Sequence, residues 1–496
     1  MKKIISVLLL CAMLCSAFAS CASEDEGKTP ASADTTTASD GVVTEAGAET
    51  KPDYLGQLEA IDYGGRDYNI LCRDSKIYEV WAEAEMGETI NDAIFRRNKA
   101  VEEKYKVVIN KIDSPGDWGT QEDFKSAVKR SVQGQDGAYD LVAGYLAYTS
   151  TLAMEGMFYN LYDIDTIDLS NIWWTQGFVE NNTIENCLFT TVGDISLTMW
   201  EGIYALYFNK QLALDNNVGD LYQMVKDKTW TQDTFEGLVK QVSSDIDGDS
   251  QYTNEDLYGF VTNRHSLRAL ITTSNIPIAT RNDEGTYDLV YYGDKVVALY
   301  ERIYAFINEG NNVFFSKPTD DADYTEMMDM FLENRGLFIS GTLDNTTTLR
   351  QMDTDFGILP FPLYDANQEN YISHSYDGLS VFGIPSSVKD PECSGAILEA
   401  LGAESKASVI PDFYETVLKG KVARDNDSEA MLDLIRDALY FDFGFVHAVS
   451  INGLFQFFGD KLQDGVENFA SAYEKQSKVF NKAFEKVLDA YMKVTG

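Results

Sequence analysis

The fold is decided by the stretch YNILC at residues 68–72, which the polar residues Arg73, Asp74 and Ser75 follow. A short apolar run that ends in polar residues is typical of a buried β-strand. Helix and strand patterns then alternate downstream, with a helix over 89–105, a strand over 106–112, a helix over 123–132 and a strand over 139–144. Strands that are separated by helices form βαβ units, so we expect an α/β protein with a parallel sheet.

The C-terminal segment is predicted to be a long amphipathic helix. Apolar residues recur there at helical intervals from Val466 to Tyr491. Asp464 and Glu467 have the spacing of a capping box, which predicts where this helix begins.

Residues 1–20 have the layout of a secretory signal peptide, with Lys2 and Lys3 at the start and an apolar run from Ile4 to Leu14. That run is too short to remain in a membrane as a permanent span. The residues Phe18-Ala19-Ser20-Cys21 resemble the bacterial lipobox, which implies that Cys21 carries lipid and anchors the protein to the cell membrane. An ordinary signal peptide with an incidental cysteine is the alternative.

Residues 21–60 are predicted to be the lipidated cysteine and a disordered acidic tether, because most of this segment is small or polar. The rest is globular, since hydrophobic residues make up 44% of the chain, and its length suits about two or three domains. The formal net charge of −39 would repel phosphate backbones, so we expect no nucleic-acid partner.

A series of motifs follows the first predicted strand. They are GETINDAIFRRN at 87–98, DLSNIWW at 168–174, TVGDIS at 191–196, NRGLFISG at 334–341, GILPFP at 357–362 and IPSSV at 384–388. In this order they resemble the family 1 extracellular solute-binding proteins, the carbohydrate-binding components of ABC importers that include maltodextrin-binding protein.

The resemblance implies a periplasmic-binding-protein-like type II fold, with two α/β lobes joined by a multi-crossing hinge and a ligand cleft between them. Lobe 1 would comprise residues 61–187 and 376–420, and lobe 2 residues 188–375 and 421–496. The crossings would lie near Cys187, Tyr376 and Lys421. The implied function is that of a monomeric extracytoplasmic lipoprotein that binds an oligosaccharide and delivers it to ABC transporter permease subunits.

A sugar presents hydroxyl groups around an apolar face, so its site needs aromatic planes and planar polar side chains. Ligands of α/β sheets bind at the carboxyl ends of the strands. We therefore sought such residues at strand ends and crossings, although each aromatic ring could equally be core. The candidates are Arg73, Asp74, Trp81, Tyr145, Trp173, Trp174, Asp194, Trp200, Gly341, Thr342, Tyr376 and Asp377.

Residues 245–256 have the spacing of an EF-hand calcium loop. The predicted ligands are Asp245, Asp247, Asp249, the carbonyl of Gln251, and Asp256. Two residues depart from the pattern, because Ser250 replaces the usual glycine and Asp256 is shorter than the usual glutamate. We expect a structural Ca²⁺ here, with an acidic solvated turn as the alternative.

A secreted carbohydrate-active hydrolase is the main alternative function, since paired carboxylates abound. However, the sequence holds no nucleophile elbow, no HExxH motif and no P-loop, and its 3 histidines are scattered, so we expect no enzyme. A ligand-presenting subunit of a sensor kinase is a second alternative. Cys72, Cys187 and Cys393 show no zinc spacing, and either free thiols or one disulfide remain open.

Overall fold

The computed structural model describes residues 51–317, 325–420 and 425–495. The predicted signal peptide, Cys21, most of the tether and the crossing near Lys421 lie outside these ranges. In the described part of the chain, no helix is long and apolar enough to cross a membrane. Lys51–Gly496 cluster as one compact unit, so the lobe boundaries given above stay a prediction.

The first sheet contains the strands that the opening sequence pattern predicted. Its order is β11-β3-β1-β2, and the strands are β1 (Arg66–Arg73), β2 (Val107–Ser114), β3 (Leu141–Tyr145) and β11 (Ser380–Gly383). β1 is parallel to both β2 and β3, as expected for βαβ units. β11 comes from far along the chain and is antiparallel to β3. A purely parallel sheet was therefore the wrong prediction at this edge.

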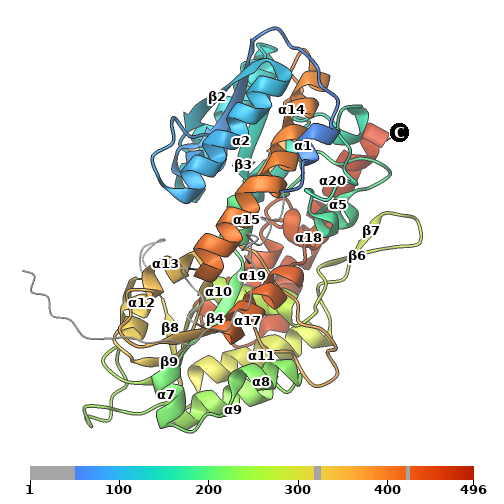
Figure 1. The fold of residues 1–496 in the computed structure, drawn as a ribbon. Helices are drawn as coiled ribbons and strands as arrows, with labels where there is room; N and C mark the ends of the chain where they lie inside the picture. Colours follow the sequence, from blue (N-terminus) through green and yellow to red (C-terminus); the bar gives the residue numbers. More distant parts are fainter. Residues whose placement is uncertain (1–50, 318–324, 421–424, 496) are drawn as a thin grey trace, which may run out of the picture. The chain divides into compact units, whose positions relative to one another are not determined.

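Helices α2 (Thr89–Tyr105) and α14 (Pro391–Glu404) lie side by side next to this sheet (Figure 1). α2 has the bounds that its periodicity predicted. Its start is capped by the Glu88 carboxylate, which accepts a hydrogen bond from Asn91 N at 2.7 Å. It ends at Lys106, whose left-handed backbone (φ 50°) cannot continue a helix.

The second sheet has the order β10-β4-β9-β5-β8 and is mixed. Its strands are β4 (Tyr204–Asn209), β5 (Tyr258–Asn263), β8 (Val313–Ser316), β9 (Gly336–Thr342) and β10 (Phe356–Leu359). Successive strand residues point to opposite faces. Accordingly Phe260 and Phe338 belong to one hydrophobic cluster, while their neighbours Val261 and Ile339 belong to another. The sheet is thus covered on both faces.

The C-terminal helix α20 (Phe469–Thr495) is present, but the predicted capping box is wrong. Asp464 follows the last residue of α19 (Leu454–Gln463), where Gly465 at φ 68° turns the chain. The start of α20 is capped by Asn468, whose side chain accepts a hydrogen bond from Ser471 N at 2.8 Å. Asp464 and Glu467 have the sequence spacing of a capping box, but the chain turns between them, so they do not lie in the first turn of one helix.

Other elements connect and cover the two sheets. The short helical segments are η1 (Asp74–Glu79), η2 (Trp118–Thr120), η3 (Leu161–Asp163) and η4 (Leu343–Asn345), and β6 (Ala279–Arg281) and β7 (Tyr287–Leu289) form a hairpin. The α-helices are α1 (Tyr54–Gln57), α3 (Gln121–Gly134), α4 (Leu146–Met154), α5 (Gln176–Asn182), α6 (Leu197–Glu201), α7 (Lys210–Asp215), α8 (Leu221–Lys226), α9 (Gln232–Val242), α10 (Arg264–Thr273), α11 (Asp294–Asn308), α12 (Thr325–Leu332), α13 (Thr346–Leu349), α15 (Ile410–Asp412), α17 (Asn426–Asp437) and α18 (Phe443–Val446); the π-helical turns are η5 (Ser405–Val409) and η6 (Phe413–Lys419).

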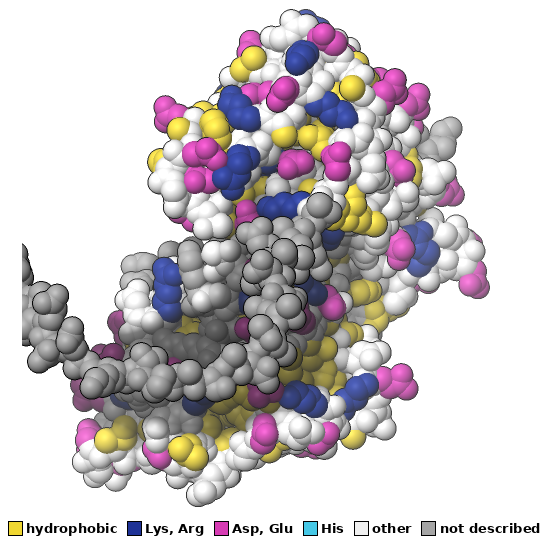
Figure 2. Space-filling view, viewed as in Figure 1, with side chains coloured by type: hydrophobic (Ala, Val, Ile, Leu, Met, Phe, Trp, Pro, Cys, Tyr) yellow, Lys and Arg dark blue, Asp and Glu magenta, His cyan; other side chains and the backbone are white. Residues whose placement is uncertain are grey.

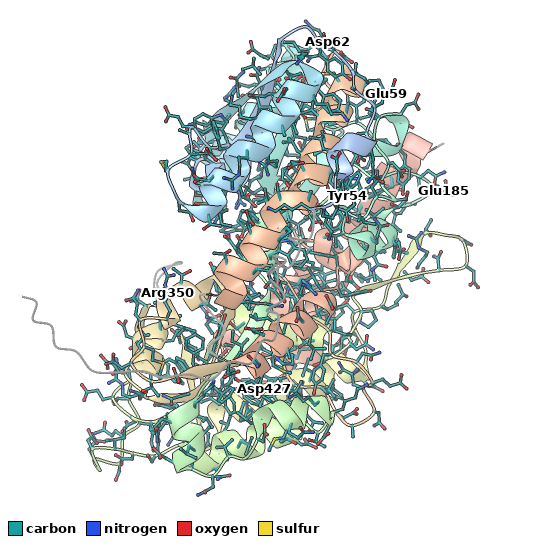
Figure 3. The ribbon with its side chains drawn as sticks, viewed as in Figure 1. Tyr54, Glu59, Asp62, Glu185, Arg350 and Asp427 are labelled. Atoms are coloured by element: carbon teal, nitrogen blue, oxygen red, sulfur yellow. The ribbon has the colours of Figure 1, made fainter. Side chains whose placement is uncertain are left out.

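Glu399 of α14 is a buried acceptor that organises the surrounding core. It accepts the indole N–H of Trp173 at 2.7 Å and that of Trp174 at 2.9 Å. Tyr54 of α1, labelled in Figure 3, covers this cluster, and its ring lies 6.2 Å from that of Trp173. Burial raises the pKa of Glu399 to about 7, and the hydrogen bonds that it accepts limit the rise.

Replacing Glu399 is predicted to destabilise the protein. Glu399→Ala leaves two buried indole N–H groups without their acceptor, and the free energy of unfolding should fall by about 2–4 kcal/mol in urea titrations. Glu485→Ala, at an exposed position of α20, is the control and should leave it within about 0.5 kcal/mol.

The raised pKa also predicts a pH dependence for Glu399→Gln, which stays neutral. The folded protein binds the Glu399 proton more tightly than the unfolded chain, so this stabilisation is full at low pH and is lost as pH rises through about 7. The stability of Glu399→Gln relative to wild type should therefore increase between about pH 5 and about pH 8. A constant difference across this range would contradict the assignment.

Candidate functional site

A cavity of about 340 Å³ lies where elements of both sheets meet. One part of its wall follows the carboxyl ends of β1, β2 and β3, as expected for α/β sheets. The other part comes from the end of α6, the end of β9 and the segment before β11. The lining residues are Arg73, Ser75, Lys76, Asp117, Tyr145, Glu201, Gly202, Thr342, Asp344 and Tyr376.

Arg73 is the buried cation of this cavity and is only 1% exposed. Its guanidinium lies 5.1 Å from the ring centre of Tyr145, and its Nη1 lies 3.8 Å from Asp117 Oδ1. Nη2 donates a hydrogen bond to Ser380 Oγ at 2.9 Å. Among the described atoms, its Nε has no hydrogen-bond partner.

A buried network compensates the charge of Arg73. Ser380 Oγ, which accepts from Arg73, donates in turn to the carboxylate of Glu79. Glu79 is 1% exposed and also accepts the backbone N–H and the hydroxyl of Thr198, each at 2.8 Å. The chain of contacts joins β1, η1, α6 and β11, and so holds the elements of the cavity wall together.

Aromatic rings form a second part of the wall. Tyr145 stacks on Tyr148 with centroids 5.4 Å apart and meets Tyr376 edge-on at 6.5 Å. Trp118, which is 47% exposed, lies 6.1 Å from the Tyr145 ring. The Tyr145 hydroxyl donates to Asp377 Oδ1 at 3.2 Å, and Asp377 Oδ2 accepts from Gln456 at 2.9 Å. These contacts fix the ring of Tyr145 and the carboxylate of Asp377.

Carboxylates line the opposite part of the cavity. Tyr78 donates a hydrogen bond to Glu201, and Thr342 donates one to Asp344. Burial raises the pKa of Glu201 to about 7; the Tyr78 hydrogen bond opposes this rise and the nearby charge of Glu79 adds to it. The wall therefore offers hydrogen-bond acceptors beside aromatic rings and a guanidinium, as polyhydroxylated ligands require.

Arg73, Tyr145, Thr342 and Tyr376 were singled out from the sequence, and the structure brings all four together in the cavity. Asp377 does not line it but holds the hydroxyl of Tyr145. The strand-end rule accounts for Arg73 and Tyr145, which end β1 and β3.

The prediction that one ring of Trp173 or Trp174 reaches the cleft is wrong. The two rings are 5% and 2% exposed, because Glu399 supplies acceptors for both indole N–H groups inside the core. Asp194 is also removed from the cavity. It is 4% exposed and pairs with Lys406 Nζ of η5 at 3.2 Å, which ties the segment before α6 to η5.

Four further candidates lie outside the cavity lining. Asp74 is exposed on η1, and Trp81 is half-buried with the Lys111 amine 6.0 Å from its ring centre. Trp200 packs against the hydrophobic core. Gly341 is buried against Asn345, whose Oδ1 would lie 2.2 Å from an added Cβ. None of the four lines this cavity, so a role for them in ligand binding stays a prediction.

Six lining residues were missed by sequence reasoning. Asp117 follows the carboxyl end of β2, so the strand-end rule could have found it. Glu201, Gly202 and Asp344 come from short helical segments that carry no periodic signal. The missed residues are Ser75, Lys76, Asp117, Glu201, Gly202 and Asp344.

The predicted calcium loop places three carboxylates close together. Oxygen atoms of Asp245, Asp247 and Asp249 lie within 4.8 Å of one another. Ser250 adopts φ 66°, the left-handed conformation for which the motif usually has glycine. Asp256 does not join this cluster. It is 1% exposed, and its oxygens accept backbone N–H groups of Ile246 at 2.9 Å and Thr253 at 2.8 Å, so it closes the loop by hydrogen bonds.

Charged side chains of both signs are mixed on the face of the molecule that Figure 2 shows. On the face in Figure 2, Lys and Arg side chains are scattered among Asp and Glu rather than gathered into one basic patch.

Neither a protein-family model nor a curated protein matches the chain. Solved structures do match over most of its length. The GacH receptor of Streptomyces glaucescens, determined unliganded and with acarbose, is 12% identical with a TM-score of 0.53, and the match covers 86% of this chain and 99% of the receptor.

Two further structures agree. An ABC substrate-binding protein from Listeria monocytogenes in complex with cycloalternan is 11% identical, with a TM-score of 0.51 and coverage of 85% of this chain and 98% of that one. The maltose-maltodextrin binding protein of Alicyclobacillus acidocaldarius is 10% identical, with a TM-score of 0.51 and coverage of 85% and 100%. The predicted fold class is thereby confirmed: the chain has the α/β, type II fold of the periplasmic binding proteins.

Proposed function

We propose that the protein is an extracytoplasmic binding protein that captures a carbohydrate and delivers it to an ABC transporter permease. One observation carries this proposal: the cavity sets the rings of Tyr145 and Tyr376 beside the guanidinium of Arg73 and the carboxylates of Asp117 and Glu201. Aromatic faces suit the apolar side of a sugar, and charged planar groups suit its hydroxyls.

The neighbours of like fold support the same ligand class. They bind acarbose, cycloalternan or maltodextrins, and their names describe receptors and binding proteins rather than enzymes. Because these neighbours are binding proteins, we propose capture without catalysis. Delivery to a permease by a monomer follows from the same resemblance.

Sugar binding is predicted to raise the melting temperature of the protein. A thermal-shift panel of mono- and oligosaccharides, with maltose, maltotetraose and raffinose among them, should contain at least one ligand that does so. Calorimetry with that sugar should show a loss of about 1–3 kcal/mol for Tyr145→Ala and for Tyr376→Ala, by analogy with the range for a nucleobase stacked on an aromatic side chain. Tyr162→Ala, which removes a ring that is 40% exposed and outside the cavity, is the control. Wild-type affinity in both cavity variants would place the ligand elsewhere.

We also propose a structural Ca²⁺ held by Asp245, Asp247 and Asp249 with the carbonyl of Gln251. Support comes from the approach of the three carboxylates and from the motif spacing. Without a cation these carboxylates repel one another, so the ion would stabilise the loop.

Chelation is predicted to lower the melting temperature of wild type. At a calcium concentration of about 100 times Kd, the bound ion adds about 2.7 kcal/mol of stability. The variant Asp247→Ala/Asp249→Ala should show no response to EDTA. Asp283→Ala/Glu284→Ala, an exposed acidic pair on the β6–β7 turn, should keep the wild-type response. Equal responses in all three proteins would exclude this site.

We propose, from the sequence alone, that the mature chain is tethered to the cell membrane through a lipid on Cys21. Cys21→Ser is predicted to release the protein from the membrane fraction into the soluble fraction, because the lipid supplies the hydrophobic anchor. Fractionation after a high-salt wash checks this. A variant that stays with the membrane would require another anchor.

A further inference from the structure

The ring of Tyr376 lies between two glycines, Gly202 and Gly378, which precede strands of different sheets. Gly202 follows α6 and precedes β4 of the second sheet. Gly378 precedes β11 of the first sheet. Tyr376 itself is half-buried and lines the cavity.

Neither glycine leaves room for a side chain. A Cβ added at Gly202 would lie 2.1 Å from Cδ1 and 2.5 Å from Cε1 of Tyr376. A Cβ added at Gly378 would lie 2.2 Å from Cε2 and 2.9 Å from Cδ2 of the same ring. Carbon atoms without a bond pack at about 3.5–4.0 Å. The ring is therefore held from its two opposite sides.

Backbone conformation does not require glycine at either position. Gly202 has φ −83° and ψ 0°, which any residue can adopt. Gly378 does not belong to the glycines with positive φ. A Cβ added at Gly202 would also lie 2.8 Å from the backbone oxygen of Thr198, and one added at Gly378 would lie 2.9 Å from Cζ of Tyr145. Because the closest contacts are those with the Tyr376 ring, room for this ring is the main reason that the fold needs glycine at these two sites.

Backbone hydrogen bonds also hold Tyr376 next to Gly202. Its N–H donates to Gly202 O at 2.9 Å, and the preceding Ser375 bridges to Ile203. On the cavity side the ring meets Tyr145 edge-on at 6.5 Å. A displacement of Tyr376 would therefore change the aromatic wall against which a ligand packs.

We propose that Gly202 and Gly378 are positioning residues that form a slot for the ring of Tyr376 and thereby determine the ligand specificity of the cavity. The inference rests on the proposed function for its ligand, a carbohydrate, but the slot itself is tested without one. A methyl group on either glycine pushes the ring out of the slot, and the ring then presents a different surface to the cavity.

The test combines Gly202→Ala and Gly378→Ala with Tyr376→Ala in two double-mutant cycles. Urea unfolding of the full chain gives stability, and the sugar panel described above gives the thermal shift. In the wild-type background each glycine variant should lower stability and reduce the thermal shift of any responding sugar by at least half. In the Tyr376→Ala background the same substitution should cause less than half of that stability loss, because the ring that makes the closest contacts with the added methyl group is gone.

Gly237→Ala is the matched control. Gly237 lies in α9, and nothing lies within 4 Å of its added Cβ, so this variant should keep the thermal shift. If Gly202→Ala does not fold, the Gly202→Ala/Tyr376→Ala protein should fold, which supports the slot equally. Additive stability losses in both cycles would overturn the proposal. So would glycine variants that keep the full thermal shift of a responding sugar. If no sugar shifts the wild type, the proposed function fails, whereas the stability cycles still decide whether the slot exists.

Discussion

The buried charges of Arg73 and Glu79, both hydrogen-bonded to Ser380 Oγ, are the constraint on which the cavity depends. Both charged side chains are 1% exposed, and a charge without compensation at that depth is strongly destabilising. Compensation requires that Ser380 of β11 stands between them and that Thr198 of α6 supplies two further donors. Because Thr198 and Ser380 lie far along the chain from Arg73 and Glu79, compensating these two charges assembles several sides of the site at once.

The aromatic wall builds on that frame. Arg73 lies over the face of Tyr145, which in turn contacts Tyr148, Tyr376 and Trp118. A guanidinium held against an aromatic face is a favourable interaction. The rings are therefore rigid before any ligand arrives, and rigid groups lose little conformational entropy when a ligand binds.

The core around Glu399 shows how the fold keeps other aromatic residues out of the site. Trp173 and Trp174 were candidates for stacking on a sugar, but both donate their indole N–H to the buried carboxylate of Glu399. Their rings support α14 beside α2, and the helices in turn cover the first sheet (Figure 1). The indole N–H groups of these two rings already have a hydrogen-bond partner in the core, and the buried rings are not accessible to a ligand.

Local patterns in the sequence determined the elements and part of the site. The bounds of α2 follow from its apolar period and its cap at Glu88, and the strand ends at Arg73 and Tyr145 located two cavity residues. Only the tertiary structure decided that Trp173 and Trp174 are core, because their acceptor lies 226 and 225 residues further along the chain. It also placed Glu201 and Asp344 in the cavity and Tyr376 between two glycines. Periodicity in the sequence indicates which face of a helix or strand is apolar. The acceptor for a buried polar group, and the glycine that leaves room for a ring, come from distant parts of the chain, so local patterns do not reveal them.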